Sequence, residues 1–184
     1  MLVVGQGNGN IRAFVNMGNG NKPVWKEKMR FFQGVGVKEH STPVIFDPDG
    51  NGKWVLISGS GDGGIYAFRI KGMKKGLPEW ERVTGPFDSV KVDRFSVPTL
   101  VKDEKSVYLF VGQQDGRIRT FTSEIEGKPF DYRKLRFTEK GLLEGIRMNE
   151  HSSPFVSLND GVFDIISGDY NGNLRHFLCK KKLM

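Results

Sequence analysis

Short apolar runs recur along the chain, and each is soon followed by a glycine. Trp54–Ile57 and Val107–Val111 are apolar throughout, which is typical of strands covered on both faces. The next apolar stretch alternates with polar residues, as in Ile118–Phe121, and this pattern indicates a strand with one exposed face. One stretch, Glu139–Met148, has a helix-like pattern, and we expect it to lie inside a connection. The pattern as a whole predicts many short strands rather than long helices.

Four glycine-rich segments of the form G-x-x-[N/D]-G-x-[I/L] divide the chain into repeats. They are Gly5–Ile11, Gly59–Ile65, Gly112–Ile118 and Gly168–Leu174. Their first glycines are 54, 53 and 56 residues apart, and a phenylalanine follows each of these glycines after nine residues. Asn-Gly and Asp-Gly are the strongest short-range signals of a β-hairpin, because both turn residues must tolerate positive φ. We therefore expect a hairpin at each segment.

Two further markers share this period. A Ser-x-Pro triplet precedes the glycine segment in three repeats, and a proline with a nearby aromatic residue follows it. The triplets are Ser41–Pro43, Ser96–Pro98 and Ser152–Pro154, and the later pairs are Pro23 with Trp25, Pro78 with Trp80, and Pro129 with Phe130. Each marker predicts one more strand, because proline is tolerated at the start of a strand. A full repeat then has four strands in about 54 residues, which describes a β-propeller blade.

The predicted fold class is therefore all-β, with roughly three and a half propeller blades of four antiparallel strands in a single array. Blade 1 is partial and takes residues 1–40, blade 2 takes 41–95, blade 3 takes 96–151, and blade 4 is partial and takes 152–184. Blade 1 lacks its Ser-x-Pro strand and blade 4 lacks its outer strand, so we expect three, four, four and three strands.

Three arrangements fit such an array. The chain can be a piece of a longer propeller protein, several copies can associate into a full ring, or four blades can close alone. An open half-ring would expose the apolar faces and edges of its end blades. We therefore expect the protein to be a homo-oligomer or part of something larger.

The order of these markers resembles the FG-GAP/VCBS repeats of integrin-α-like β-propellers. The shared elements are Ser-x-Pro, an acidic glycine-rich loop, an apolar strand, glycine, Asn/Asp-Gly, isoleucine and an aromatic residue, and they cover nearly the whole chain. The segment Asn16–Pro23 looks like the inter-strand loop of such repeats. The resemblance implies a protein or glycan ligand and an extracellular or cell-surface location, although the apolar start Met1–Val4 is too short for a signal peptide.

The same family often carries a calcium loop of the form D-x-[D/N]-x-[D/N]-G-x-x-D. In the second repeat Asp47, Asp49 and Asn51 match the first three ligand positions, and Val55 replaces the closing aspartate. The resemblance thus implies a Ca²⁺ site at Asp47, Asp49 and Asn51, although Ca²⁺ normally takes six or more oxygen ligands. The alternative is a plain polar turn, because aspartate, asparagine and glycine are the usual residues of turns.

Composition and charge change this picture little. The 24 glycines and 14 phenylalanines agree with many turns and tightly packed strands, and the net charge of +7 comes from residues scattered along the chain rather than from a basic stripe, so nucleic-acid binding is not expected. No apolar run approaches the 18 residues of a membrane span. The single cysteine, Cys179, allows no internal disulfide. Trp25, Trp54 and Trp80 occupy repeat strand positions and are expected in the core.

The chain shows no convincing catalytic set. Glu39–Ser41 and Glu150–Ser152 both read Glu-His-Ser, but neighbours in a strand point to opposite faces, and their recurrence indicates a structural role where the chain enters the inner strand. We therefore predict a non-catalytic binding or scaffolding module that acts through loops such as Lys71–Gly76, Gly85–Arg94 and Thr138–Glu150. The alternative is a carbohydrate-active enzyme or an accessory sugar-binding domain on a propeller scaffold.

Overall fold

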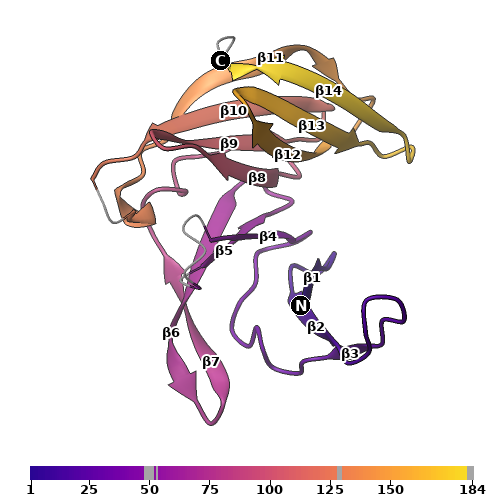
Figure 1. Ribbon diagram of the computed structural model, residues 1–184, viewed down its shortest axis with the longest axis vertical. Helices are drawn as coiled ribbons and strands as arrows, with labels where there is room; N and C mark the ends of the chain where they lie inside the picture. Colours follow the sequence, from indigo (N-terminus) through magenta and orange to yellow (C-terminus); the bar gives the residue numbers. More distant parts are fainter. Residues whose placement is uncertain (48–51, 53, 128–129, 182–184) are drawn as a thin grey trace.

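The described residues of the protein form four separate antiparallel β-sheets (Figure 1). The computed structural model describes residues 1–47, 52, 54–127 and 130–181. These residues contain fourteen strands and one short 3₁₀ helix, Tyr132–Lys134, and no α-helix. The expected all-β class is therefore confirmed.

Each sheet is a simple meander in which consecutive strands are hydrogen-bonded neighbours. Sheet 1 consists of β1 (Leu2–Gly5), β2 (Ile11–Asn16) and β3 (Trp25–Glu27). Sheet 2 consists of β4 (Thr42–Phe46), β5 (Val55–Gly59), β6 (Ile65–Lys74) and β7 (Leu77–Val83). Sheet 3 consists of β8 (Val97–Lys102), β9 (Ser106–Gly112), β10 (Arg117–Glu124) and β11 (Thr138–Arg147). Sheet 4 consists of β12 (Ser153–Asn159), β13 (Val162–Gly168) and β14 (Leu174–Lys180). In the described residues the sheets thus have three, four, four and three strands, as the repeats predict.

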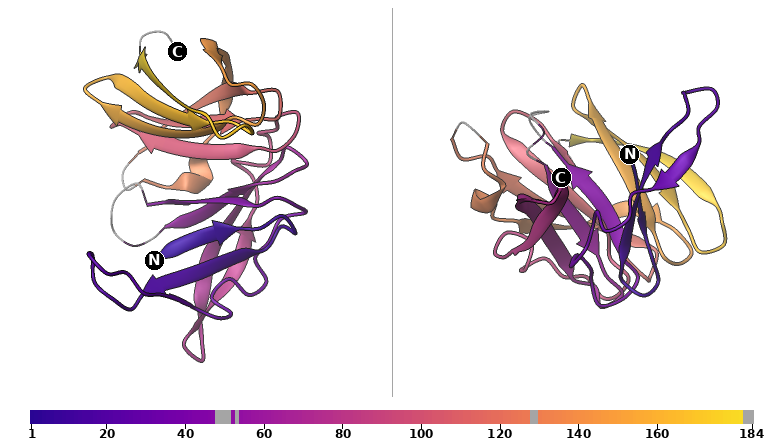
Figure 2. Two further views of the ribbon diagram at one scale, coloured as in Figure 1. Left: turned by 90° about the vertical axis from the view of Figure 1, so that its right-hand side faces the viewer. Right: turned by 90° about the horizontal axis from the view of Figure 1, so that it is seen from below.

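The sheets follow one another face to face around an open arc (Figures 1 and 2). The first strands of successive sheets approach one another, so that β8 contacts both β4 and β12, and β1 contacts β4. Later strands of each sheet lie farther from the centre of the arc (Figure 1). The Ser-x-Pro triplets therefore lead the strands nearest the centre of the arc.

The four predicted hairpins are present at the glycine-rich segments. The glycine that follows Asn or Asp in each segment has a φ of 81 to 83°, which a residue with a side chain rarely adopts; these are Gly9, Gly63, Gly116 and Gly172. In the first three segments the preceding Asn or Asp side chain accepts a hydrogen bond from the amide two residues on; in the second, Asp62 Oδ1 lies 3.1 Å from Gly64 N. These bonds form an Asx turn within each of these three hairpins, and the turn helps to fix the register of both flanking strands.

The hydrophobic core lies in the layers between sheets. Ile57 and Ile65 of sheet 2 pack against Leu109 of sheet 3, and all three are at most 2% exposed. Phe110 of sheet 3 packs in the same way against Phe163 of sheet 4, with ring centroids 5.1 Å apart. Strands in these layers are covered on both faces, which explains their unbroken apolar runs.

One expected helix is absent. The stretch Glu139–Met148 lies almost entirely in β11, the outer strand of sheet 3. Gly141 and Gly145 have φ values of 107° and 74°, which are incompatible with a regular helix. The pairing of β10 with β11 also changes register twice. These irregularities disturb the alternation of apolar residues and produce the misleading helical pattern.

The expected contact loops and tryptophan positions also need correction. Thr138–Glu150 is mostly strand, and Lys71–Gly76 belongs largely to β6, whereas Gly85–Arg94 is a loop as predicted. Trp54 and Trp80 pack together in the core, but Trp25 is 49% exposed on the outward face of sheet 1. Sheet 1 has no described strand in front of that face to bury it.

Candidate binding surface

Every junction between two sheets is built around the serine of a Ser-x-Pro triplet. At the junction of sheets 3 and 4, Ser152 Oγ accepts a hydrogen bond from Gln113 N at 2.9 Å and donates one to Arg117 O at 2.6 Å. Ser41 and Ser96 make the same two bonds to the hairpins of sheets 1 and 2. Each serine is at most 6% exposed. One hydroxyl thus ties the start of a sheet to the hairpin of the sheet before it.

The first glycine of each hairpin makes room for this serine. A methyl group on Gly112 would overlap the carbonyl group of Ser152, and one on Gly59 would overlap that of Ser96. Gly5 stands in the same relation to Ser41. None of these three glycines has a positive φ, so glycine is needed here for close approach and not for backbone conformation.

The residue before each serine adopts a strained backbone conformation. His40, Phe95 and His151 have φ values of 48°, 52° and 53°. Positive φ is a genuine outlier for bulky side chains and costs about 1–3 kcal/mol. Each of these amides donates a hydrogen bond to the preceding hairpin, as in His151 N to Gln114 O at 2.9 Å. The junction contacts hold the strained residue in place and aim its ring at a shared surface.

The rings of these residues form a continuous row, which we call the ring stack. It consists of His40, Phe95, His151 and Tyr170, with centroid distances of 4.9, 4.8 and 5.5 Å in that order. Tyr170 comes from the hairpin of sheet 4 and is 74% exposed. His40 is also exposed, while Phe95 and His151 are half-buried. The ring stack therefore crosses the entries of three successive sheets and ends in an accessible tyrosine.

Polar groups flank the ring stack. The Arg94 guanidinium carbon lies 5.1 Å from the centroid of the Phe95 ring. Near the other end, Asp169 accepts hydrogen bonds from Asn149 Nδ2 at 3.2 Å and from Asn173. The bond from the Asn173 side chain is the main cause that lowers the pKa of Asp169, so this carboxylate is charged at neutral pH. Apolar ring surface beside fixed polar groups is a common composition for a ligand site.

The two Glu-His-Ser sequences do not form a nucleophile and its base. The Ser41 and Ser152 hydroxyls are buried and donate to main-chain carbonyl groups, so they serve as junction bonds. The His40 ring and the His151 ring each pack against the Phe95 ring. Both histidines lie at the entry to the inner strand, as the repeat pattern predicts. Sequence reasoning missed that Phe95 holds the same position, which its place before Ser96 would have revealed.

Only part of the predicted calcium loop can be placed. Asp49 and Asn51 lie outside the described residues, and Asp47 Oδ2 accepts a hydrogen bond from Gly52 N at 3.0 Å. Asp47 Oδ1 is buried and has no hydrogen-bond partner within the described ranges. The described part of the loop thus offers one carboxylate oxygen, and the predicted Ca²⁺ site at Asp47, Asp49 and Asn51 stays a prediction. Among the described residues, no three His, Cys, Asp or Glu side chains converge for metal binding.

Two acidic residues in the third and fourth repeats, Asp103 and Asp164, are paired with basic side chains. Asp164 Oδ1 lies 2.8 Å from His176 Nε2 on the outward face of sheet 4. Asp103, in the turn between β8 and β9, accepts hydrogen bonds from Lys181 and from Ser106 N. Burial acts to raise the pKa of Asp103, but the bonds from Lys181 and the backbone outweigh it and lower the pKa to about 2. The Asp103–Lys181 pair links sheet 3 to the end of sheet 4.

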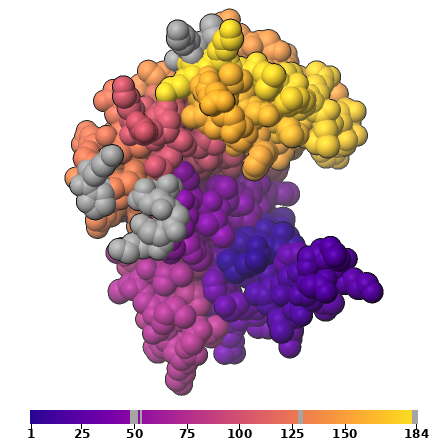
Figure 3. Space-filling model, viewed as in Figure 1, coloured from indigo at the N-terminus to yellow at the C-terminus, as the bar shows by residue number. Residues whose placement is uncertain are grey.

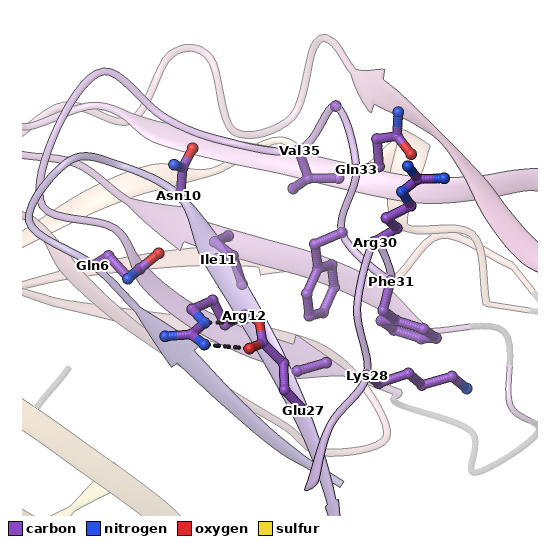
Figure 4. Close-up of a pocket in the computed structure, with 13 residues that line it drawn as sticks. Gln6, Asn10, Ile11, Arg12, Glu27, Lys28, Arg30, Phe31, Gln33 and Val35 are labelled. Atoms are coloured by element: carbon purple, nitrogen blue, oxygen red, sulfur yellow. Dashed lines mark hydrogen bonds and ion pairs between the residues drawn. The ribbon is translucent and has the colours of Figure 1, made fainter.

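A pocket of about 360 Å³ lies between sheet 1 and the loop that follows it (Figure 4). Ile11 and Phe31 line it, and the ion pair of Arg12 and Glu27 crosses one side. The bond from Arg12 lowers the pKa of Glu27, so this pair is ionised and locally neutral. Arg30 also borders a neighbouring pocket of about 510 Å³. We place this region below the ring stack, because Arg12 and Glu27 are already paired with each other and Lys28 and Arg30 are exposed.

The surface is hollowed between the two end sheets (Figure 3). Sheet 1 turns Leu2 and Trp25 outward with exposures of 44% and 49%. Sheet 4 turns Phe155, Leu174 and Leu178 outward, each at least 66% exposed. Both end faces thus carry exposed apolar side chains, on sheet 4 beside the Asp164–His176 pair, and exposed apolar patches are a feature of binding surfaces.

In the described part of the chain, no helix is long and apolar enough to cross a membrane. Comparison of the chain with protein-family models, with curated proteins and with solved structures finds no match. The resemblance to FG-GAP/VCBS repeats therefore stays a prediction from the repeat pattern.

Proposed function

We propose that the four sheets are blades of a β-propeller of the FG-GAP/VCBS type. Support comes from the meander order of each sheet, the arc formed by the sheets and the three equivalent serine junctions. Blades of this kind radiate from an axis near their first strands. The ring stack then lies near that axis, at the end of the array where the hairpins meet the blade entries.

We further propose that the module is a non-catalytic binding protein whose ring stack contacts a glycan. The observation that carries this proposal is the row of four touching rings, held by three residues with strained backbones. Strain of this kind concentrates at functional sites. The apolar faces of sugar rings can pack against exposed aromatic side chains, while flanking groups such as Arg94 and Asp169 supply hydrogen bonds to hydroxyl groups.

Tyr170 is the residue with which to test this proposal. Its ring is largely exposed and lies at the end of the ring stack, so Tyr170→Ala should leave the junctions intact. We expect the wild-type protein to bind oligosaccharides on a glycan array and Tyr170→Ala to bind at least tenfold more weakly. Phe155→Ala removes a similarly exposed ring from the outward face of sheet 4 and serves as the matched control.

The comparison of the two variants decides between ligand classes. Equal loss of glycan binding in both variants, or no glycan bound by a folded wild-type protein, would overturn the assignment of the ring stack. A protein ligand whose binding depends on Tyr170 would keep the site but replace the glycan with a peptide. Hydrolysis of a bound oligosaccharide would favour the enzyme alternative.

A further inference from the structure

The hairpin of sheet 4 has the same sequence form as the other three but lacks their junction. Gly168–Leu174 forms the usual turn, in which Asp169 N donates to Asn173 O at 3.1 Å. In sheets 1 to 3 the carbonyl groups equivalent to Asn173 O and Tyr170 O also accept hydrogen bonds from the segment that leads into the first strand of the next sheet, which we call the entry segment of that sheet. Within the described ranges, no such segment lies on Gly168–Leu174.

Neither the backbone conformation nor the packing of the described chain requires a glycine at position 168. Its φ is not positive, so its backbone conformation suits any residue. A methyl group on Gly168 would meet only Leu174 Cδ2 at 3.6 Å and Asn173 O at 3.9 Å, which are ordinary contacts. At Gly5, Gly59 and Gly112 the methyl group would instead overlap the serine carbonyl of the following sheet. The glycine at position 168 fits a serine carbonyl that the described chain does not supply.

The apolar residues around this hairpin point to the same missing neighbour. Ile118 of sheet 3 is fully buried under sheet 4, whereas Leu174 at the same repeat position is 76% exposed. Phe110 is likewise fully buried, and Ile166 at its repeat position is 45% exposed. Both exposed residues lie on the face that the other sheets cover with the next sheet along the arc.

We propose that Gly168–Leu174 is a docking site for an extended Ser-x-Pro segment of another repeat of this kind. The serine hydroxyl accepts from Asp169 N and donates to Asn173 O, and the serine carbonyl lies over Gly168. The strand that follows the proline covers Ile166 and Leu174. The residue before the serine meets Tyr170, so an aromatic ring at that place extends the ring stack.

The occupant is a Ser-x-Pro segment outside the three that the chain already uses. Ser41, Ser96 and Ser152 are at most 6% exposed because each is built into its own junction. A second copy of the chain therefore has no such segment to lend unless one of its junctions opens. The three internal junctions define the chemistry of the occupant, since all use the same serine, the same two backbone partners and the same glycine.

A synthetic peptide with the sequence of Lys91–Lys102 is the direct probe. It carries the complete entry segment of sheet 3. The segment includes Val92 and Phe95, whose amides donate hydrogen bonds to the hairpin of sheet 2, then Ser96 and the whole of β8. We expect its addition to isotope-labelled protein to shift the amide resonances of Gly168–Leu174. A peptide with alanine in place of Ser96 should bind at least tenfold more weakly, because it leaves both backbone partners without the hydroxyl.

Gly168→Ala supplies the matched protein variant. It should fold normally, because its methyl group has room, yet bind the peptide at least tenfold more weakly. The proposal is overturned if millimolar peptide shifts no resonance of Gly168–Leu174, or if Gly168→Ala binds it as well as the wild type. The proposal is also overturned if the peptide binds at Gly59–Ile65 instead, by displacing the chain's own Lys91–Lys102. Glycan binding by Gly168→Ala tests the ring stack separately, so the two proposals can fail independently.

Discussion

The hairpins of sheets 3 and 4 share a sequence pattern but differ in their surroundings. Gly112–Ile118 is capped by Ser152, and its isoleucine is fully buried. Gly168–Leu174 makes the same turn, yet its leucine is 76% exposed and the space beside Gly168 is open. The turn is therefore set by its own residues, whereas burial and close packing come from the next sheet. Equivalent substitutions in the two hairpins should separate these contributions.

The largest difference is expected for truncation of the apolar residue at the end of the motif. Ile118→Ala should destabilise the protein by about 4 kcal/mol, because it removes a fully buried side chain and leaves a cavity. Leu174→Ala should change the free energy of unfolding by less than about 0.5 kcal/mol, since the side chain is already in solvent. Urea denaturation of both variants measures the difference, and similar losses would show that sheet 4 is covered in solution.

The first glycine should show the next largest contrast. Gly112→Ala forces its methyl group into the Ser152 carbonyl and should cost about 3 kcal/mol. Gly168→Ala should be neutral or stabilise the protein by up to about 1 kcal/mol, because alanine restricts the unfolded chain. Melting temperatures of the two variants check this order. A destabilised Gly168→Ala would mean that the free protein already fills the space beside Gly168.

The serine hydroxyl accounts for a smaller part of the junction. Ser152→Ala leaves Gln113 N and Arg117 O without their partner in a buried setting and should cost about 2 kcal/mol. Ser153→Ala, one residue further along and exposed, should change stability by less than about 0.5 kcal/mol. If chemical denaturation gives equal values for both serines, the hydroxyl is not the element that fixes the junction.

The smallest expected effect concerns the charged link between sheets 3 and 4. The pKa of Asp103 is lowered to about 2 in the folded protein, against about 3.9 in an unfolded chain. The carboxylate therefore adds stability above pH 4 that disappears as the pH falls toward 2. After allowance for solvent screening we expect about 1 kcal/mol. Acid titration of Lys181→Met, monitored by circular dichroism, should show a weaker loss between pH 4 and 2 than the wild type.

Much of the fold could be predicted from the sequence because its signals are local. Asn-Gly and Asp-Gly determine their own turns, and the Ser-x-Pro triplets mark strand starts, so the number of strands in each sheet followed from counting. The outer strand of sheet 3 was misjudged because Gly141 and Gly145 distort its alternation. Trp25 was expected in the core because a repeat position does not show whether a neighbouring sheet is present.

The candidate site was harder to predict. His40 and His151 were recognised as equivalent, but the ring stack also needs Tyr170, which comes from a different position of the repeat. Contacts between sheets join residues far apart in the chain, and no local pattern reveals them. The predicted ligands Asp49 and Asn51 lie outside the described residues, so calcium binding at that loop stays a prediction, and titration of the metal-free protein with Ca²⁺ would test it.

The junction depends on few side chains, and this affects how freely the repeat can change in evolution. One serine and one glycine meet backbone groups of the neighbouring sheet, and those groups are the same whatever residues carry them. The remaining strand positions can therefore exchange one apolar residue for another while neighbouring sheets keep the same spacing. Duplication of a whole repeat would also carry both halves of the junction with it. Selection on these few positions would be sufficient to preserve the architecture while the sequence of the rest diverged.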